Sequence, residues 1–193
     1  VLANPIRAAI LGGGGRISYY LAQELLKSNI SVKIIERSKE SAQQIAELLP
    51  GAVVLNGDIT DHELLQEEGI ESADAFVALT GLDEGNILSA LYAKQRKVSK
   101  VIAKVNNDGL VSLVKETALD SVISPKSLAT NQILRYVRAR EASADQGEIS
   151  GLYKIADGSI EVLEFLASPE NKNLLNIPLK DLKTKKHLLI ACI

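Results

Sequence analysis

The hydrophobic and polar positions of the first 124 residues alternate between two kinds of segment. Short apolar runs rich in β-branched residues are followed by longer stretches in which apolar residues recur at helical spacing. This alternation is typical of repeated β–α units that build a parallel sheet. We expect strands at Arg7–Leu11, Ser31–Glu36, Ala52–Asn56, Ala75–Leu79, Val101–Val105 and Ser121–Ser124, and helices near Ile17–Lys27, Lys39–Leu48, Asp61–Glu67, Glu84–Arg96 and Gly109–Thr117.

Six strands in this order predict an α/β fold with a Rossmann-like, doubly wound parallel sheet. The pattern changes at Pro125, which can open a helix. In that helix Leu128, Ile133, Leu134 and Val137 share one stripe. The stripe either packs on its own domain or belongs to a crossover helix that packs against a second subunit.

The last third of the chain predicts a linker and part of a small α+β module. Residues 142–150 are small and polar, as in linkers, and Asp157–Gly158 is a strong hairpin signal. The roughly 45 residues that remain are few for an independent core, so we expect this module to be incomplete or completed by a partner. The expected organisation is a Rossmann domain with its crossover helix at 1–141, a linker at 142–150 and an incomplete C-terminal domain at 151–193. The elements expected there are strands at Leu152–Ala156, Ile160–Leu166 and Leu188–Ile193 and a short helix near Leu179–Leu182.

Composition narrows the class of protein further. The chain has 193 residues, of which 46% are hydrophobic and 24% charged, so it can bury a core and is not disordered. A net charge of -2 gives no electrostatic footprint for nucleic acid, and we expect none as a partner. The lone Cys192 and the distant His62 and His187 form neither a disulfide nor a zinc site. Because no apolar run has the length of a membrane span, we expect a cytoplasmic protein without direct membrane insertion.

Four consecutive glycines, Gly12 to Gly15, follow the first expected strand. Each raises the entropy lost on folding, so their presence indicates that something approaches the backbone closely. In the dinucleotide fingerprint, glycines serve a tight turn, the pyrophosphate and helix packing. Two registers fit: Gly12, Gly14 and Ile17, or Gly13, Gly15 and Ser18. We favour the second because Ser18 is small enough for the packing position.

An acidic residue stands where this fingerprint requires one. Glu36 ends the second expected strand, eighteen residues after Ser18, where a carboxylate accepts hydrogen bonds from the adenosine ribose. Such a carboxylate repels a 2′-phosphate, which favours NAD(H) or an adenine nucleotide over NADP. The neighbouring Arg37 leaves a second possibility open, since it could reach a phosphate or stack on adenine. The alternative for Glu36 is a surface carboxylate at a strand end.

Further candidates follow the later strands, whose carboxyl ends border the same crevice. Asp58 could accept from the adenine amino group or cap the next helix. Glu84 opens the helix after Thr80, where acids are also favoured by the helix dipole. Lys104 could pair with phosphate or with Glu84. The candidate cofactor-binding residues are Gly13, Gly14, Gly15, Arg16, Ile17, Glu36, Arg37, Asp58, Ile59, Thr80, Glu84 and Lys104.

Taken together, these segments resemble the regulator-of-potassium-conductance (RCK or KTN) family, in particular its TrkA-type subunits of Trk potassium uptake systems. The resemblance covers nearly the whole chain, and the set of motifs is specific although each one alone is not. Ser18 departs from the family's usual third glycine. The motifs are Gly-Gly-Gly-Arg-Ile-Ser (13–18), Ile-Glu-Arg (35–37), Leu-Asn-Gly-Asp-Ile-Thr (55–60), Ala-Asp-Ala-Phe-Val-Ala-Leu-Thr (73–80), Asp-Glu-Gly-Asn-Ile (83–87), Ala-Lys (93–94) and Ile-Ser-Pro (123–125).

The resemblance implies a cytoplasmic nucleotide-sensing subunit rather than an enzyme. Members of the family bind NAD(H), ATP or ADP in the first domain and assemble as dimers and rings against a membrane potassium channel or transporter. The helix after Pro125 is similar to the family's crossover helix, and the residues after Gly151 resemble the start of its C-terminal domain. Because full-length TrkA-type chains carry such pairs in tandem, we expect this chain to be one half.

Three alternatives remain at this point. The first is an NAD-dependent oxidoreductase, although none of the five tyrosines has a lysine four residues later. Neither histidine is a credible base, since His62 lies in an acidic helix start and His187 lies among lysines outside the crevice. The second is an assembly module whose glycine loop binds no nucleotide. The third is the soluble tail of a cation antiporter or channel.

Overall fold

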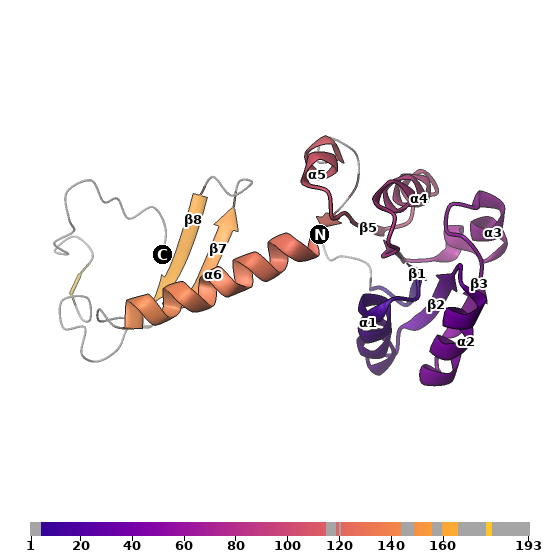
Figure 1. The fold of residues 1–193 in the computed structure, drawn as a ribbon, viewed down its shortest axis with the longest axis horizontal. Coiled ribbons are helices and arrows are strands. Elements are labelled where there is room, and N and C mark those ends of the chain that lie inside the picture. Colours follow the sequence, from indigo (N-terminus) through magenta and orange to yellow (C-terminus); the bar gives the residue numbers. More distant parts are fainter. Residues whose placement is uncertain are drawn as a thin grey trace. The chain divides into compact units, whose positions relative to one another are not determined.

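The computed structural model of the protein describes residues 5–114, 119, 121–143, 149–155, 160–165 and 177–178. The chain divides into two compact units, Val1–Leu128 and Ala129–Ile193, each of which is described by itself (Figure 1). The expected short helix at 179–182 and the expected last strand at 188–193 lie outside the described residues. The domain boundary at residue 141 stays a prediction.

The first unit contains a six-stranded sheet in the order β3-β2-β1-β4-β5-β6, and every neighbouring pair is parallel. This is the strand order of a doubly wound Rossmann fold, so the predicted fold class is confirmed. The order reverses between β1 and β4, where Gly12 lies opposite Ala78. The strands are β1 Ala8–Gly12, β2 Ser31–Glu36, β3 Val53–Asn56, β4 Ala75–Ala78, β5 Lys100–Lys104 and β6 Ser121–Ile123.

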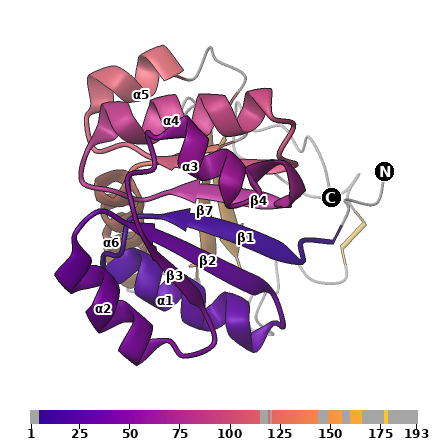
Figure 2. The ribbon, with the colours of Figure 1, turned by 90° about the vertical axis from the view of Figure 1, so that its right-hand side faces the viewer.

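Helices cover both faces of this sheet. Figure 2 shows α1 and α2 on one side and α3, α4 and α5 on the other. Two of the helix starts are capped in the usual way, α2 by the Ser38 hydroxyl and α3 by the Asp61 carboxylate. The elements are α1 Arg16–Lys27, α2 Lys39–Leu48, α3 His62–Glu67, the 3₁₀ helix η1 Ile70–Ser72, α4 Asp83–Gln95 and α5 Asp108–Val114.

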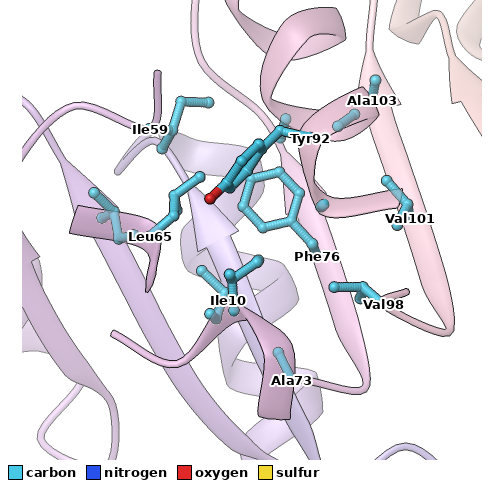
Figure 3. Packing of buried hydrophobic residues seen from close by; sticks show 14 of the residues in the cluster. Ile10, Ile59, Leu65, Ala73, Phe76, Tyr92, Val98, Val101 and Ala103 are labelled. Atoms are coloured by element: carbon cyan, nitrogen blue, oxygen red, sulfur yellow. The ribbon is translucent and has the colours of Figure 1, made fainter. Parts of the chain in front are cut away.

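The two helical layers produce two apolar cores, one on each face of the sheet. Neighbouring strand residues alternate between them: Ile10 packs under α3 and α4, while Leu11 packs under α1 and α2. Figure 3 shows the first core, in which Phe76 of β4 is fully buried beside Tyr92 of α4. The alternation explains why β4 is apolar at every position, since both of its faces are covered. Both cores hold the carboxyl ends of the strands in place.

The helix α6 (Pro125–Ser143) begins in the first unit and continues into the second, which also contains β7 (Ile149–Ile155) and β8 (Ile160–Phe165). β7 and β8 form the predicted antiparallel hairpin. The expected linker at 142–150 stays a prediction, and within it α6 continues through Ser143 and β7 begins at Ile149. Small polar residues can extend a helix, and Ile149 pairs with Phe165. Among the described residues no helix combines the length and the hydropathy that a membrane crossing requires.

Candidate functional site

A cavity of about 720 Å³ lies at the carboxyl ends of the strands in the first unit. Its position at the reversal of strand order, between β1 and β4, is where open α/β sheets bind ligands. Its volume is within the usual range of small-molecule and cofactor sites. The lining residues are Gly13, Gly14, Gly15, Ile35, Glu36, Arg37, Gly57, Asp58, Ile59, Thr80, Thr60, Leu79, Gly81, Leu82, Gly85 and Lys104.

The glycines of the β1–α1 loop lack side chains for different reasons. Gly13 has φ +95°, and a Cβ atom there would lie 3.1 Å from the backbone of Thr80. A Cβ at Gly14 would lie 2.8 Å from Cδ1 of Ile45 and 3.0 Å from the Glu36 side chain. A Cβ at Gly15 would meet no protein atom within 4 Å. The fold therefore requires glycine at 13, a side chain at 14 would have to displace the side chains of Ile45 and Glu36, and position 15 is open on the protein side.

The start of α1 differs from the starts of α2 and α3. Its N-cap residue is Gly15, which provides no side-chain hydrogen bond, so the first N–H groups of the helix are uncapped. Uncapped N–H groups at a helix N-terminus are a general binding site for phosphate groups. Ser18, one turn in, is fully buried, while Ile17 is 46% exposed. Burial of Ser18 agrees with the second register, in which this position packs the helix against the sheet.

Glu36 lies at the end of β2 directly beside the glycine loop. Its Oε2 accepts a hydrogen bond from the Gly14 N–H at 2.5 Å, and its Oε1 accepts one from the Ser38 N–H at 2.7 Å. These bonds fix the carboxylate at the mouth of the β1–α1 loop. A carboxylate offers about four acceptor positions, so each oxygen can still accept a further hydrogen bond. Glu36 is therefore held ready for the hydroxyl groups of a ligand.

Asp58 and Arg37 form a second charged pair at the same edge. Arg37 Nη1 lies 3.8 Å from Asp58 Oδ2, and the other carboxylate oxygen accepts from the N–H and hydroxyl of Thr60 at 2.9 and 2.8 Å. The hydrogen bond from the Thr60 backbone is the main cause that lowers the pKa of Asp58. Asp58 is therefore an ionised acceptor at neutral pH, and the expected capping role falls instead to Asp61.

Thr80 and Lys104 border the other half of the cavity, at the ends of β4 and β5. The N–H and hydroxyl of Thr80 both donate to the side chain of Asn86, at 3.0 and 2.7 Å. Thr80 therefore contributes a wall rather than a donor to the cavity. Among the described residues the ammonium group of Lys104 has neither a hydrogen bond nor an ion pair, so the pairing with Glu84 does not form.

The cavity brings together nine of the twelve candidate residues, and three lie outside its lining. Arg16 and Ile17 form the first turn of α1, and their side chains are exposed. Their contribution to the uncapped helix start is therefore their backbone N–H groups. Glu84 is exposed on the first turn of α4, as expected of an acid at a helix N-terminus. Within the described parts of the chain, no group of three histidines, cysteines or carboxylates is placed to hold a metal ion.

Sequence reasoning missed several residues around the cavity. The hydrophobic wall includes Ile35, Leu79 and Leu82, and Gly85 faces the cavity from the first turn of α4. Ile35 and Leu79 were predictable, since each is the last apolar residue of an expected strand whose carboxyl end borders the crevice. Asn86, near the start of the helix that follows Thr80, is fully buried, although a polar residue in a helical pattern is usually solvent-exposed.

A parallel sheet of this order, with a glycine-rich β1–α1 loop and an acid at the end of β2, defines the class of Rossmann-like domains. Within that class, the sequence profile of the TrkA-N domain matches residues 9–125. The chain belongs to the TrkA-N domain family.

Proteins with related sequences carry names from potassium transport. The chain is 36% identical over 191 residues to the Trk system potassium uptake protein TrkA of Azorhizobium caulinodans, which covers 98% of this chain and 40% of that protein. It is 38% identical over 162 residues to the protein of the same name from Vibrio alginolyticus, with 84% and 34% covered. The chain thus spans well under half the length of these relatives.

Solved structures with the same fold include two of particular interest. The TrkA-N domain of the inner membrane protein ybaL from Escherichia coli superposes with a TM-score of 0.62 at 21% identity, over 69% of this chain and 98% of that one. The GsuK channel bound to NAD superposes with a TM-score of 0.58 at 20% identity, over 81% and 27%. At these identities the likeness establishes the fold.

Proposed function

We propose that the chain is a nucleotide-sensing regulatory part of a potassium uptake system and that it binds NAD(H), or alternatively ATP or ADP, in the cavity at the carboxyl edge of the sheet. The observation that carries this proposal is the uncapped start of α1 facing the same cavity as the fixed carboxylate of Glu36. The N–H groups at the start of α1 suit a pyrophosphate, and the Glu36 carboxylate suits a ribose.

The residues of the cavity have distinct roles in this proposal. The N–H groups at the start of α1 bind the pyrophosphate, and Glu36 accepts from the ribose hydroxyls. Asp58 accepts from the adenine amino group, and Arg37 lies beside it over the base or a phosphate. Lys104 supplies a positive charge in the half of the cavity bordered by the ends of β4 and β5. Glu36 disfavours a 2′-phosphate at the ribose, which selects against NADP.

The named relatives support the link to potassium uptake, because the chain matches Trk system proteins over most of its own length. The solved structures of GsuK bound to NAD and of GsuK bound to ADP support the ligand class through a shared fold. In the proposed mechanism, different nucleotides favour different orientations of paired subunits, and this population shift controls a membrane potassium channel or transporter subunit. The chain would then act in the cytoplasm, attached to the inner face of the membrane through that partner.

We further propose that the chain assembles as a homodimer or a larger ring. Four hydrophobic side chains of α6 are exposed in the single chain, to between 44% and 64% of their surface. Large apolar side chains that are left exposed on one helix are typical of a protein–protein interaction site. The residues are Leu128, Ile133, Tyr136 and Val137.

The enzyme alternative finds less support in the cavity. Its described lining includes no histidine, tyrosine or cysteine, and these are the usual proton donors of nicotinamide-dependent enzymes. The lining offers two carboxylates, an arginine and a lysine, which suit binding. We therefore propose a binding subunit without catalytic activity.

Calorimetric titration of the purified chain with NADH, NAD, ATP and ADP tests the proposal. We expect saturable heat with at least one of the four and a weaker response to NADPH than to NADH. Absence of heat with all four would overturn the nucleotide proposal and leave the assembly module in its place. Turnover of NADH with small carbonyl substrates would instead revive the oxidoreductase.

A further inference from the structure

The face of α4 toward the sheet carries three polar residues on successive turns. Asp83, Asn86 and Ser89 follow one another at intervals of three residues, and Asn86 and Ser89 are fully buried. Each of them binds the backbone of a different segment at the edge of the cavity. In contrast, Leu88 on the same helix is 61% exposed. The orientation of α4 thus buries two polar side chains and exposes a leucine. Burial of polar groups costs free energy unless they are hydrogen-bonded, so these hydrogen bonds must offset the cost of this orientation.

Asn86 has the central position in this row. Its Oδ1 accepts from the N–H and the hydroxyl of Thr80, at 3.0 and 2.7 Å. Its Nδ2 donates to the carbonyl oxygen of Thr80 at 3.1 Å and to that of Lys104 at 2.9 Å. All four hydrogen-bonding positions of one amide are therefore used to join the ends of β4 and β5 to α4.

Its two neighbours in the row fix the segments on either side. The Asp83 carboxylate accepts from the N–H groups of Asn106 and Asn107 at 2.9 and 2.8 Å, directly after β5. The Ser89 hydroxyl donates to the carbonyl oxygen of Ile59 at 2.9 Å, in the loop after β3. Ser89 also donates to the carbonyl oxygen of Gly85 at 2.8 Å, on its own helix. Asn86 differs from both neighbours because it binds Thr80 and Lys104, the two cavity-lining residues at the ends of β4 and β5.

The cavity itself has two halves. The β1–α1 loop and the ends of β2 and β3 provide the glycines, Glu36 and Asp58, which in the proposed function hold adenosine and pyrophosphate. The ends of β4 and β5 provide Thr80 and Lys104, which face whatever extends beyond the pyrophosphate. A nucleoside diphosphate needs only the first half, whereas a dinucleotide also needs the second.

We propose that Asn86 is a positioning residue that makes the site competent for dinucleotides, because it holds Thr80 and Lys104 in register with the glycine loop. This inference rests on the proposed nucleotide site and adds which residue determines the length of ligand that fits. Asn86 acts through Thr80 and Lys104 and is buried away from the ligand. Its loss should therefore change the ratio of NADH to ADP affinity rather than nucleotide binding as a whole.

The test compares two substitutions at Asn86 with a core control. Asn86→Ala removes all four hydrogen bonds. Asn86→Asp retains the acceptor for Thr80 and loses both donations, to the carbonyl oxygens of Thr80 and Lys104, so it serves as the second variant if the alanine variant does not fold. Val98→Ala is the control, because Val98 is 2% exposed in the same core but precedes β5 at the end of the strand away from the cavity. Thermal unfolding selects the variants that still melt cooperatively.

Dissociation constants for NADH and ADP are then measured by calorimetry. We expect both Asn86 variants to bind NADH about tenfold more weakly or worse, as for loss of a buried hydrogen bond worth about 1.4 kcal/mol, and ADP within about twofold of the unsubstituted chain. Val98→Ala should leave the NADH-to-ADP ratio unchanged despite a lower melting temperature. An unchanged ratio in the folded Asn86 variants would overturn the inference alone. Failure of the unsubstituted chain to bind either ligand would overturn the proposed function, and this inference with it.

Discussion

The glycine loop offers a pair of matched substitutions with opposite expected effects. Gly13→Ala and Gly15→Ala each add one methyl group to the same loop, two residues apart. At Gly13 the backbone has φ +95° and the methyl group would lie 3.1 Å from the Thr80 backbone. At Gly15 the backbone is extended, with φ -75° and ψ 177°, and no protein atom lies within 4 Å of the new Cβ. The first change should damage the fold, and the second should damage only the ligand site.

The magnitudes follow from these geometries. A left-handed conformation costs an alanine about 1 to 2 kcal/mol, and pressing its methyl group against a fixed backbone adds about 1 to 3 kcal/mol. We therefore expect Gly13→Ala to lower the melting temperature by about 5 to 15 °C. At Gly15 the poorer N-cap and the stiffer unfolded chain nearly cancel, which leaves a net change within about 0.5 kcal/mol. NADH affinity should nevertheless fall at least about tenfold, because the methyl group occupies space that the pyrophosphate needs.

Thermal unfolding and calorimetric titration with NADH measure both effects on the same samples. The reasoning is refuted if Gly15→Ala binds NADH as tightly as the unsubstituted chain, because the open space at this position would then not be the ligand's. It is also refuted if Gly13→Ala melts unchanged, since the tight contact with Thr80 would then relax at no cost.

Three further predictions concern single side chains. Glu36→Gln should weaken NADH binding by about 1 to 3 kcal/mol, since charged hydrogen bonds to the ribose are lost. If calorimetry shows that the variant binds NADH or ATP with unchanged affinity, the ribose site is misplaced. Ser18→Ala should raise the free energy of unfolding in urea by about 1 kcal/mol, because the buried Ser18 hydroxyl finds no hydrogen-bond partner among the described residues, and a decrease would contradict this. Two backbone N–H groups at the start of β1, that of Arg7 foremost, lower the pKa of Asp74 below its ordinary value of 3.8. Asp74 therefore stabilises the fold above that pH and loses its effect as the pH falls through the lowered pKa. Asp74→Asn should make the free energy of unfolding less dependent on pH on the acid side, and an unaltered pH dependence would exclude this role.

The sheet and the first half of the site could be predicted from the sequence for physical reasons. Strands buried on both faces must be apolar throughout, and β4 reveals itself in this way. A run of glycines is expensive unless a turn or a ligand requires it, and Glu36 stands at the spacing that a ribose acceptor needs. These features depend on residues that are close together in the chain and on the order of the strands and helices, and both can be derived from the sequence.

The second half of the site could not be predicted in the same way. In α4 the polar Asn86 is fully buried and the apolar Leu88 is 61% exposed, an orientation that the spacing of the apolar residues does not indicate. The rotation of α4 is set by hydrogen bonds to Ile59, Thr80 and Lys104, which are distant in sequence or belong to other strands. Pairings between a side chain and a remote backbone leave no periodic trace. The end of α6 is hard to predict for a related reason, since small polar residues are compatible with both helix and linker.

The most direct test of the central claim is a crystal structure of the chain grown with saturating NADH or ADP. The account predicts electron density in the cavity at the carboxyl edge of the sheet, with the pyrophosphate on the N–H groups from Gly15 to Ile17 and the ribose hydroxyls within hydrogen-bonding distance of Glu36. Nucleotide density elsewhere on the chain, or an empty cavity at saturating ligand, would contradict it.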